Sequence, residues 1–220
     1  MFESFCQLSH VNHTIYLASH SPRRIELLKQ LGLNCKVLPT DIDESVILHE
    51  LPADYVQRLA KQKAEKCFQM LAEQNLTTFD RHILGKDDFA EHQYLVIAAD
   101  TSVAIHNEIL GKPKDDNDAR AMLKLLSDSW HEVHTAIAMG TAEKLQVMLS
   151  TTNVEMMPLS DAQIEAYIKG GDQKDKAGSY GIQGQAGAWI KRIEGSYTGV
   201  MGLPIHETAL LLRQYGVNVI

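Results

Sequence analysis

The sequence predicts an α/β protein in which a mixed, twisted sheet is flanked by helices. Residues 14–33, TIYLASHSPRRIELLKQLGL, run from a short apolar stretch through small polar residues into apolar residues at helical spacing, which is typical of strand, tight loop and helix. Residues 94–99 form an unbroken apolar run that predicts a buried strand. Residues 130–139 and 145–157 alternate, are rich in β-forming residues and meet near Gly140, which predicts an antiparallel hairpin.

The loop inside residues 14–33 predicts a binding site for an anion. Ser21 stands where it can cap the helix, and Pro22 takes the first helical position, where its missing N–H costs nothing. Arg23 and Arg24 follow at the positive end of the helix dipole, although that end favours acidic residues. Free backbone N–H groups and two guanidinium groups therefore indicate a polyanionic ligand; the alternative is an ordinary capped helix with two solvated arginines.

The composition indicates one domain and argues against several classes of function. With 220 residues, 45% of them hydrophobic, the chain can form a single domain in two lobes, which we place over residues 14–220 after a loose leader, residues 1–13. The formal net charge of −7 argues against nucleic acid or an anionic membrane as a partner. We expect no membrane span and no signal peptide. The 3 cysteines are widely spaced, which fits a reducing, cytoplasmic location better than disulfides or a zinc site.

The remaining elements follow from periodicity and from turn signals. A capping-box pattern, Ser160 to Gln163, opens one helix, and Gly170 and Gly171 close it. Residues 75–93 carry no clear periodicity, and we expect an extended connection there. The expected strands cover residues 34–39 and 188–193, with a hairpin over 102–110, and the expected helices cover residues 52–74, 116–126 and 204–215.

Lys63 is the anomaly of the helix expected over residues 52–74. It falls within an apolar stripe that otherwise carries Val56, Leu59, Ala60, Ala64, Cys67, Met70 and Leu71. An unpaired buried ammonium group is costly, so Lys63 either extends its charged end to solvent or meets an anion.

Asp100 follows the apolar run of residues 94–99, and we expect it at the carboxyl end of that strand, where ligands of open α/β sheets tend to bind. The hairpin over residues 102–110 then returns the chain to Lys112. Gly111 permits close backbone approach and Pro113 stiffens the exit, so Lys112 can be held towards Asp100. Taken alone, each piece is better explained as an ordinary feature: Asp100 as an acid at a strand end, and residues 111–113 as a surface turn.

Two further segments carry candidate side chains. Residues 41–44 are acidic and include Asp43 and Glu44. The segment 175–187, DKAGSYGIQGQAG, has four glycines around Gln183 and predicts either a backbone that approaches a ligand closely or a long flexible turn.

Together these residues describe a phosphate site that uses a divalent metal. Mg²⁺ usually needs one or two protein carboxylates, with waters and substrate phosphates completing its shell, and the lysines and arginines would neutralise the remaining phosphate charge. No P-loop, protein-kinase signature or GxSxG motif is present.

Five ordered segments resemble the Maf family of nucleoside triphosphate pyrophosphatases: LASHSPRR, DE followed by LPADYVQRLAKQKA, AADTSVAIHNEILGKP, LLSDSWHEVHTAIA and DKAGSYGIQGQAGAWIKRIEGSYTGVMGLPIHET. The resemblance implies an elongated, two-lobed Maf/ITPase-like architecture with a central cleft, a cytoplasmic protein and a possible homodimer. It implies hydrolysis of nucleoside triphosphates to monophosphate and pyrophosphate, and the DKAGxYGIQG form resembles the branch that acts on dTTP and UTP. At residues 126–131, LSDSWH, the chain departs from the family, which usually has LSG and a basic residue before the histidine.

The resemblance also implies roles for single residues. Asp100 would accept the proton of the attacking water, and Glu44 would join it in holding Mg²⁺ or Mn²⁺. Base specificity would be set by Arg23, Thr101 and Gln183, and the triphosphate would be held by Arg24, Lys63 and Lys112.

Two alternatives remain open at this point. In place of dTTP and UTP hydrolysis, the chain would either degrade modified pyrimidine nucleotides as a house-cleaning enzyme, or bind nucleotides as a regulator of septum formation with incidental hydrolysis.

Overall fold

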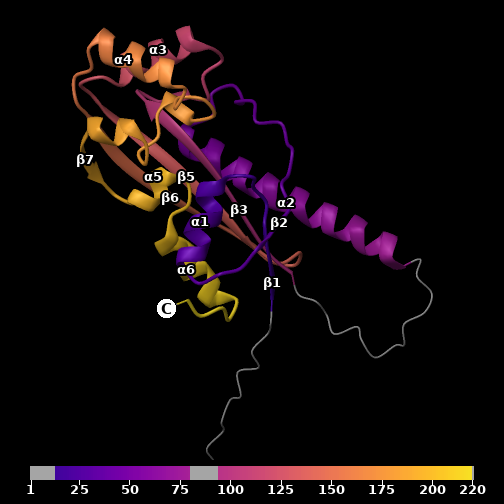
Figure 1. Ribbon diagram of the computed structural model, residues 1–220. Helices are drawn as coiled ribbons and strands as arrows, with labels where there is room; N and C mark the ends of the chain where they lie inside the picture. Colours follow the sequence, from indigo (N-terminus) through magenta and orange to yellow (C-terminus); the bar gives the residue numbers. More distant parts are fainter. Residues whose placement is uncertain (1–12, 80–93, 220) are drawn as a thin grey trace, which may run out of the picture.

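The computed structural model describes residues 13–79 and 94–219. The expected leader, except His13, and residues 80–93 of the expected connection lie outside these ranges. The expected α/β class is confirmed, because a seven-stranded mixed sheet has helices on both faces (Figure 1).

The sheet has the strand order β2-β1-β3-β5-β6-β7, and β4 also pairs with β3. β1 is parallel to both β2 and β3, whereas all the other pairs are antiparallel. The strands are β1 Thr14–Leu17, β2 Lys36–Val37, β3 Tyr94–Ile105, β4 Glu108–Leu110, β5 Trp130–Gly140, β6 Leu145–Met156 and β7 Ile190–Glu194.

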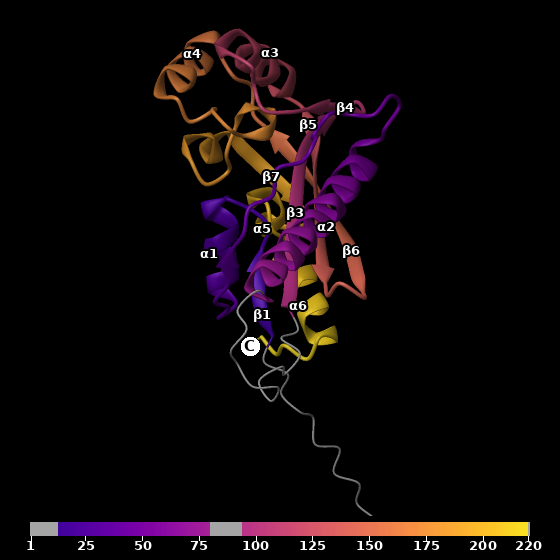
Figure 2. The same ribbon diagram turned by 90° about the vertical axis from the view of Figure 1, so that its right-hand side faces the viewer.

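Six α-helices surround the sheet in the described part of the chain. Figures 1 and 2 show α2 along one face, α1 and α6 on the opposite face, and α3 and α4 together at one end. The helices are α1 Pro22–Gln30, α2 Pro52–Phe79, α3 Asp116–Leu126, α4 Asp161–Gly170, α5 Tyr197–Met201 and α6 Ile205–Gln214, and two 3-10 turns cover Ala177–Ser179 and Gln185–Trp189.

Strand β3 is apolar on both sides because both of its faces are covered. Val96 and Ala98 pack under α2 with Val56 and Ala60. The alternate residues, such as Ile97, belong to a second cluster formed with α1 and α6. A side-chain period of two thus explains the unbroken apolar run.

Asp100 is not at the carboxyl end of its strand, as the sequence suggested, because β3 continues to Ile105. β5 pairs with β3 without a break from Val96 to Ala104 and holds it extended. On the other edge, however, the register with β1 stops at Ile97 and that with β4 begins at Val103. Asp100 therefore lies beside an interruption in the sheet. The space for a ligand that we expected at the end of the strand lies instead at this interruption.

Other local differences have simple causes. α2 continues to Phe79, beyond the expected end at residue 74, because the intervening residues include neither glycine nor proline. Ser21 occupies the N-cap position of α1, but its side chain makes no capping bond. α5 was not expected; it has five residues, and the Ser196 side chain caps it by accepting from the Gly199 N–H. The capping box of Ser160 and Gln163 is confirmed.

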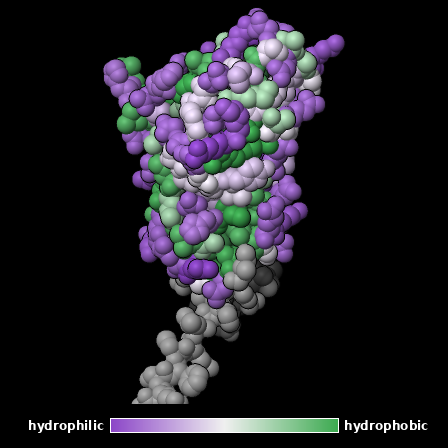
Figure 3. All heavy atoms as spheres, turned by 90° about the vertical axis from the view of Figure 1, so that its left-hand side faces the viewer, coloured by the Kyte–Doolittle hydropathy of each residue, from purple (hydrophilic) through white to green (hydrophobic). Residues whose placement is uncertain are grey.

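Two of the apolar clusters lie toward opposite ends of the sheet, and we call these two ends of the molecule its lobes. One joins β1, α1 and α6 to the sheet, and the other joins α3, α4 and the 3-10 turns to its opposite end. On the face shown in Figure 3, hydrophobic residues are divided into several areas by hydrophilic ones.

None of the helices in the described ranges has an apolar stretch of the length and hydropathy required to cross a membrane.

Candidate active site

A pocket of about 1300 Å³ opens where the sheet is interrupted. Its walls come from the β1–α1 turn, the segment before α2, the middle of β3, the turn after β4 and the 174–183 segment, so both lobes contribute. All eight residues to which the resemblance assigns a role line it: Arg23, Arg24, Glu44, Lys63, Asp100, Thr101, Lys112 and Gln183.

Lys63 joins the two carboxylates of the pocket. Its Nζ lies 2.6 Å from an oxygen of Asp100 and 2.6 Å from an oxygen of Glu44. Lys63 and Asp100 are buried, with 9% and 7% of their surfaces exposed, whereas Glu44 is exposed. Of the two explanations for a lysine on an apolar face, the structure therefore supports the one in which it meets an anion.

The two carboxylates have different electrostatic surroundings. Burial raises the pKa of Asp100 above its ordinary value, although the positive charges of Lys63 and Arg24 offset part of this effect. Burial also acts to raise the pKa of Glu44, but the Lys63 hydrogen bond and the charges of Lys63, Lys112 and Arg24 outweigh it, and the pKa of Glu44 is lowered. Asp100 is thus the carboxylate better suited to accept a proton.

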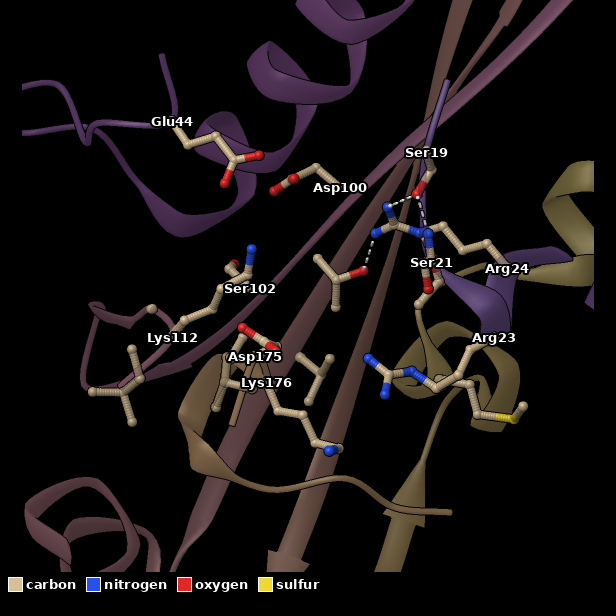
Figure 4. A pocket seen from close by; sticks show the side chains of 18 of the residues that line it. Ser19, Ser21, Arg23, Arg24, Glu44, Asp100, Ser102, Lys112, Asp175 and Lys176 are labelled. Atoms are coloured by element: carbon tan, nitrogen blue, oxygen red, sulfur yellow. Dashed lines mark hydrogen bonds between the residues drawn. The ribbon is translucent and has the colours of Figure 1, made fainter. Parts of the chain in front are cut away.

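Arg24 is held from three sides. Its Nε donates to the Gly202 carbonyl oxygen at 2.8 Å, and Nη2 donates to the Thr101 hydroxyl at 3.2 Å. Nη1 donates to the Ser19 hydroxyl at 3.2 Å (Figure 4). Among the described residues, three of its five donors therefore have partners, and two are left for a ligand. Because the guanidinium is fixed before a ligand arrives, little side-chain entropy is lost when it binds an anion.

The side chains of Arg23, Lys112 and Gln183 make no hydrogen bond or ion pair with any residue that the structure describes. The Lys112 side chain extends toward Glu44 and Asp100, and Arg23 points into the pocket from the opposite wall (Figure 4). These side chains are free to bind a ligand from two sides.

Some site residues could not be found from the sequence, and one was wrong. Ser19 and Gly202 hold Arg24, yet Gly202 is 178 positions away in the chain and carries no local signal. Asp43 lies outside the pocket lining, and its side chain instead accepts from the Ser45 backbone N–H at 2.9 Å.

The donor set fits a divalent cation that takes few protein ligands. In the described ranges, no group of three or more His, Cys, Asp or Glu side chains could hold a metal alone. Glu44 and Asp100 do converge, since an oxygen of each lies 2.6 Å from the same nitrogen. Two carboxylates beside a set of cations suit Mg²⁺, whose remaining ligands are typically waters and substrate phosphates.

The sequence of the chain was compared with models of protein families and with known proteins. The model of the family described as Maf-like protein matches residues 14–215. This chain is a member of the Maf family. Two relatives named dTTP/UTP pyrophosphatase are similar to it over most of their length. The protein from Methylobacillus flagellatus is 50% identical over 93% of this chain and 94% of its own, and that from Chromobacterium violaceum is 48% identical over 93% and 96%.

Among solved structures, the Staphylococcus aureus Ham1 protein matches this Maf chain with a TM-score of 0.42 and 16% identity, covering 65% of this chain and 71% of its own.

The departure of this Maf chain from the family at residues 126–131 has a visible backbone consequence. Asp128, in the place where the family usually has glycine, has a φ of 54°, in the left-handed region that favours glycine. None of residues 126–131 lines the pocket, so this segment contributes no side chain to the site.

Proposed function

We propose that this Maf protein hydrolyses nucleoside triphosphates between the α and β phosphates, releasing a nucleoside monophosphate and pyrophosphate, with dTTP and UTP preferred. The relatives' names support the activity and the substrates. The observation that carries the proposal is the pairing of buried Asp100 with Lys63 in a pocket that also contains Arg23, Arg24 and Lys112.

Asp100 activates the attacking water in this proposal. A carboxylate whose pKa is raised by burial holds a proton more strongly than an exposed one, which makes it a better general base. The Lys63 ammonium keeps Asp100 positioned by a 2.6 Å hydrogen bond and prevents the pKa from rising further.

The positive side chains bind the triphosphate and stabilise the leaving group. Arg24 offers two donors from a fixed guanidinium, and Lys112 and Arg23 approach from opposite walls. Negative charge grows on the departing pyrophosphate, so preorganised cations lower the barrier.

Glu44 and Asp100 would hold a divalent cation, Mg²⁺ or Mn²⁺. When bound there, the cation would supply positive charge that offsets the charge of the phosphate oxygens. Lys63 lies between the two carboxylates and keeps them close together.

Gln183 accounts for a preference for uracil and thymine. Its amide can accept from N3–H and donate to O4 of either base, while Arg23 and Thr101 would read the same base. All three line the pocket. We expect the protein to act in the cytoplasm, and a homodimer stays a prediction.

Two methylene analogues of UTP test the position of cleavage. β,γ-Methylene-UTP is expected to yield UMP, whereas α,β-methylene-UTP is expected to resist. Release of orthophosphate from UTP would contradict the proposal.

A panel of canonical and modified triphosphates, compared by kcat/KM, separates dTTP and UTP hydrolysis from house-cleaning. Binding without turnover in Mg²⁺ or Mn²⁺ would instead favour a regulator.

Asp100→Asn tests the general base. We expect it to lower kcat for UTP by about 10²–10⁴-fold, the usual contribution of such a group. Asp43→Asn is the matched control, because Asp43 lies outside the pocket lining, and it should leave kcat unchanged.

A further inference from the structure

Thr135 lies behind the pocket and contacts one of its base-reading residues. It is on β5, fully buried, and absent from the pocket lining. Its hydroxyl donates at 2.8 Å to the Gly199 carbonyl oxygen and at 3.0 Å to the Thr101 hydroxyl oxygen. The single Thr135 proton is therefore shared between two acceptors in a three-centre arrangement.

Thr101 receives two hydrogen bonds as a result. Its Oγ1 accepts from Arg24 Nη2 at 3.2 Å and from Thr135 Oγ1 at 3.0 Å. A hydroxyl oxygen has two lone pairs, and both are then occupied. No residue in the described ranges accepts the Thr101 proton, and Thr101 lines the pocket. The group that Thr101 presents to a ligand is consequently its O–H donor.

We propose that Thr135 is a positioning residue that sets the hydrogen-bonding polarity of Thr101 and thereby selects a base with a carbonyl at position 4. Uracil and thymine present an oxygen acceptor there, whereas cytosine presents an amine that donates. A fixed O–H donor pairs with the oxygen and opposes the amine. This inference rests on the proposed function, because it takes the nucleobase to lie at Thr101.

The same network explains why polarity is fixed rather than adaptable. The Gly199 carbonyl also accepts from the Gly202 N–H at 2.9 Å, and the Gly202 carbonyl accepts from Arg24 Nε at 2.8 Å. Thr135, Thr101 and Arg24 are thus tied to one turn at the end of α5. A ligand that donates to Thr101 would have to compete with Arg24 Nη2 and Thr135 for its two lone pairs, and displacing either of them would lose a hydrogen bond.

Thr135→Val tests the proposal, because valine keeps the shape of threonine and removes the hydroxyl. One lone pair of Thr101 is freed, and its hydroxyl can then accept from the cytosine amine. We expect the ratio of kcat/KM for UTP over CTP to fall about tenfold, the size of one neutral hydrogen bond. Thr135→Ser keeps the hydroxyl and should retain the wild-type ratio.

Thr152→Val is the matched control. Thr152 is a buried threonine on the neighbouring strand β6, and its hydroxyl accepts from the Ser196 N–H at 2.9 Å and donates to the Ser196 carbonyl at 3.3 Å. This variant loses a similar pair of bonds without touching Thr101, so it should lower the melting temperature and leave the UTP/CTP ratio unchanged. If Thr135→Val does not fold, Thr135→Cys replaces a strong donor by a weak one, and the ratio should again fall.

The inference is overturned if the ratio in a folded Thr135→Val or Thr135→Cys variant stays within threefold of the wild type, or if Thr152→Val changes it equally. It is also overturned if Thr135→Ser loses the ratio as fully as valine does. A wild-type protein that releases no pyrophosphate from UTP would reject the proposed function itself, which is a different result.

Discussion

At the scale of the residue, Lys63 shows how far a hydrophobic pattern can lead. A lysine inside an apolar stripe predicted either an extended side chain or a buried anion, and the pattern could not choose between them. The choice depends on which residues of β3 and of the segment before α2 lie opposite, and those come from 37 and 19 positions away. The chemistry of the position was predictable, whereas its partner was not.

Replacing Lys63 should change the pH dependence of the reaction. Burial raises the pKa of Asp100, and the Lys63 charge and hydrogen bond act against it. In Lys63→Met that opposition is lost, so the pKa of Asp100 rises further and the acidic limb of the kcat/KM profile moves to higher pH. Lys61→Met, on the exposed side of α2, should leave the limb in place. An unshifted limb in Lys63→Met would show that Asp100 is not the titrating base.

Removing the charge of Asp100 should not destabilise the fold at neutral pH. Because its pKa is higher in the folded protein than in the unfolded chain, its contribution to stability is present below the unfolded pKa and is lost as the pH rises through the folded pKa. At a pH above the folded pKa, the wild type therefore carries a charge that burial disfavours. We expect Asp100→Asn to melt at or above the wild-type temperature at pH 7. A markedly lower melting temperature would mean that the Lys63 pair stabilises the fold.

At the scale of the element, periodicity predicted what is local and missed what neighbouring strands decide. The α1 turn, the β5–β6 hairpin and the capped α4 carry their signals within a few residues. The extent of β3 does not, because its second half is held extended by β5 and β4. α5 was missed since five residues are too few to show a period.

Gly202, which ends α5, should control how well the substrate is held. Its φ is 113°, and a Cβ there would lie at ordinary contact distance, 3.5 Å from Thr101 Oγ1 and 3.7 Å from Arg24 Nε. The cost of Gly202→Ala is therefore backbone strain, which reorients the carbonyl that accepts from Arg24 Nε. We expect KM for UTP to rise several-fold, with a smaller change in kcat.

Gly171→Ala is the control for that substitution. Gly171 ends α4 with a φ of 78°, and nothing lies within 4 Å of its Cβ position. It should lose stability by a similar amount, about 1–2 kcal/mol, without a change in KM. If the two variants have the same KM, Gly202 does not contribute to substrate binding and the prediction is wrong.

At the scale of the whole molecule, the pocket is a property of topology. The order of the motifs along the chain was enough to propose eight residues, and all eight line one cavity. The contacts that hold them in place, from Gly202 and Thr135 to the β1–α1 turn and β3, connect residues up to 178 positions apart. No local pattern carries such contacts, because they form only when α5 returns to the sheet.

Because both lobes line the pocket, a bound ligand should stabilise the molecule as a whole. α,β-Methylene-UTP with Mg²⁺ at about 100 times its dissociation constant adds roughly 2.7 kcal/mol, which for a chain of this size raises the melting temperature by roughly 5–10 °C. UMP at the same concentration as the analogue should give a smaller shift, since it lacks the two phosphates expected at Arg24 and Lys112 and therefore binds more weakly. Lys112→Ala, on an exposed turn, should reduce the shift for the analogue and leave that for UMP nearly unchanged. Equal shifts for UMP and the analogue would mean that these cations do not bind a triphosphate.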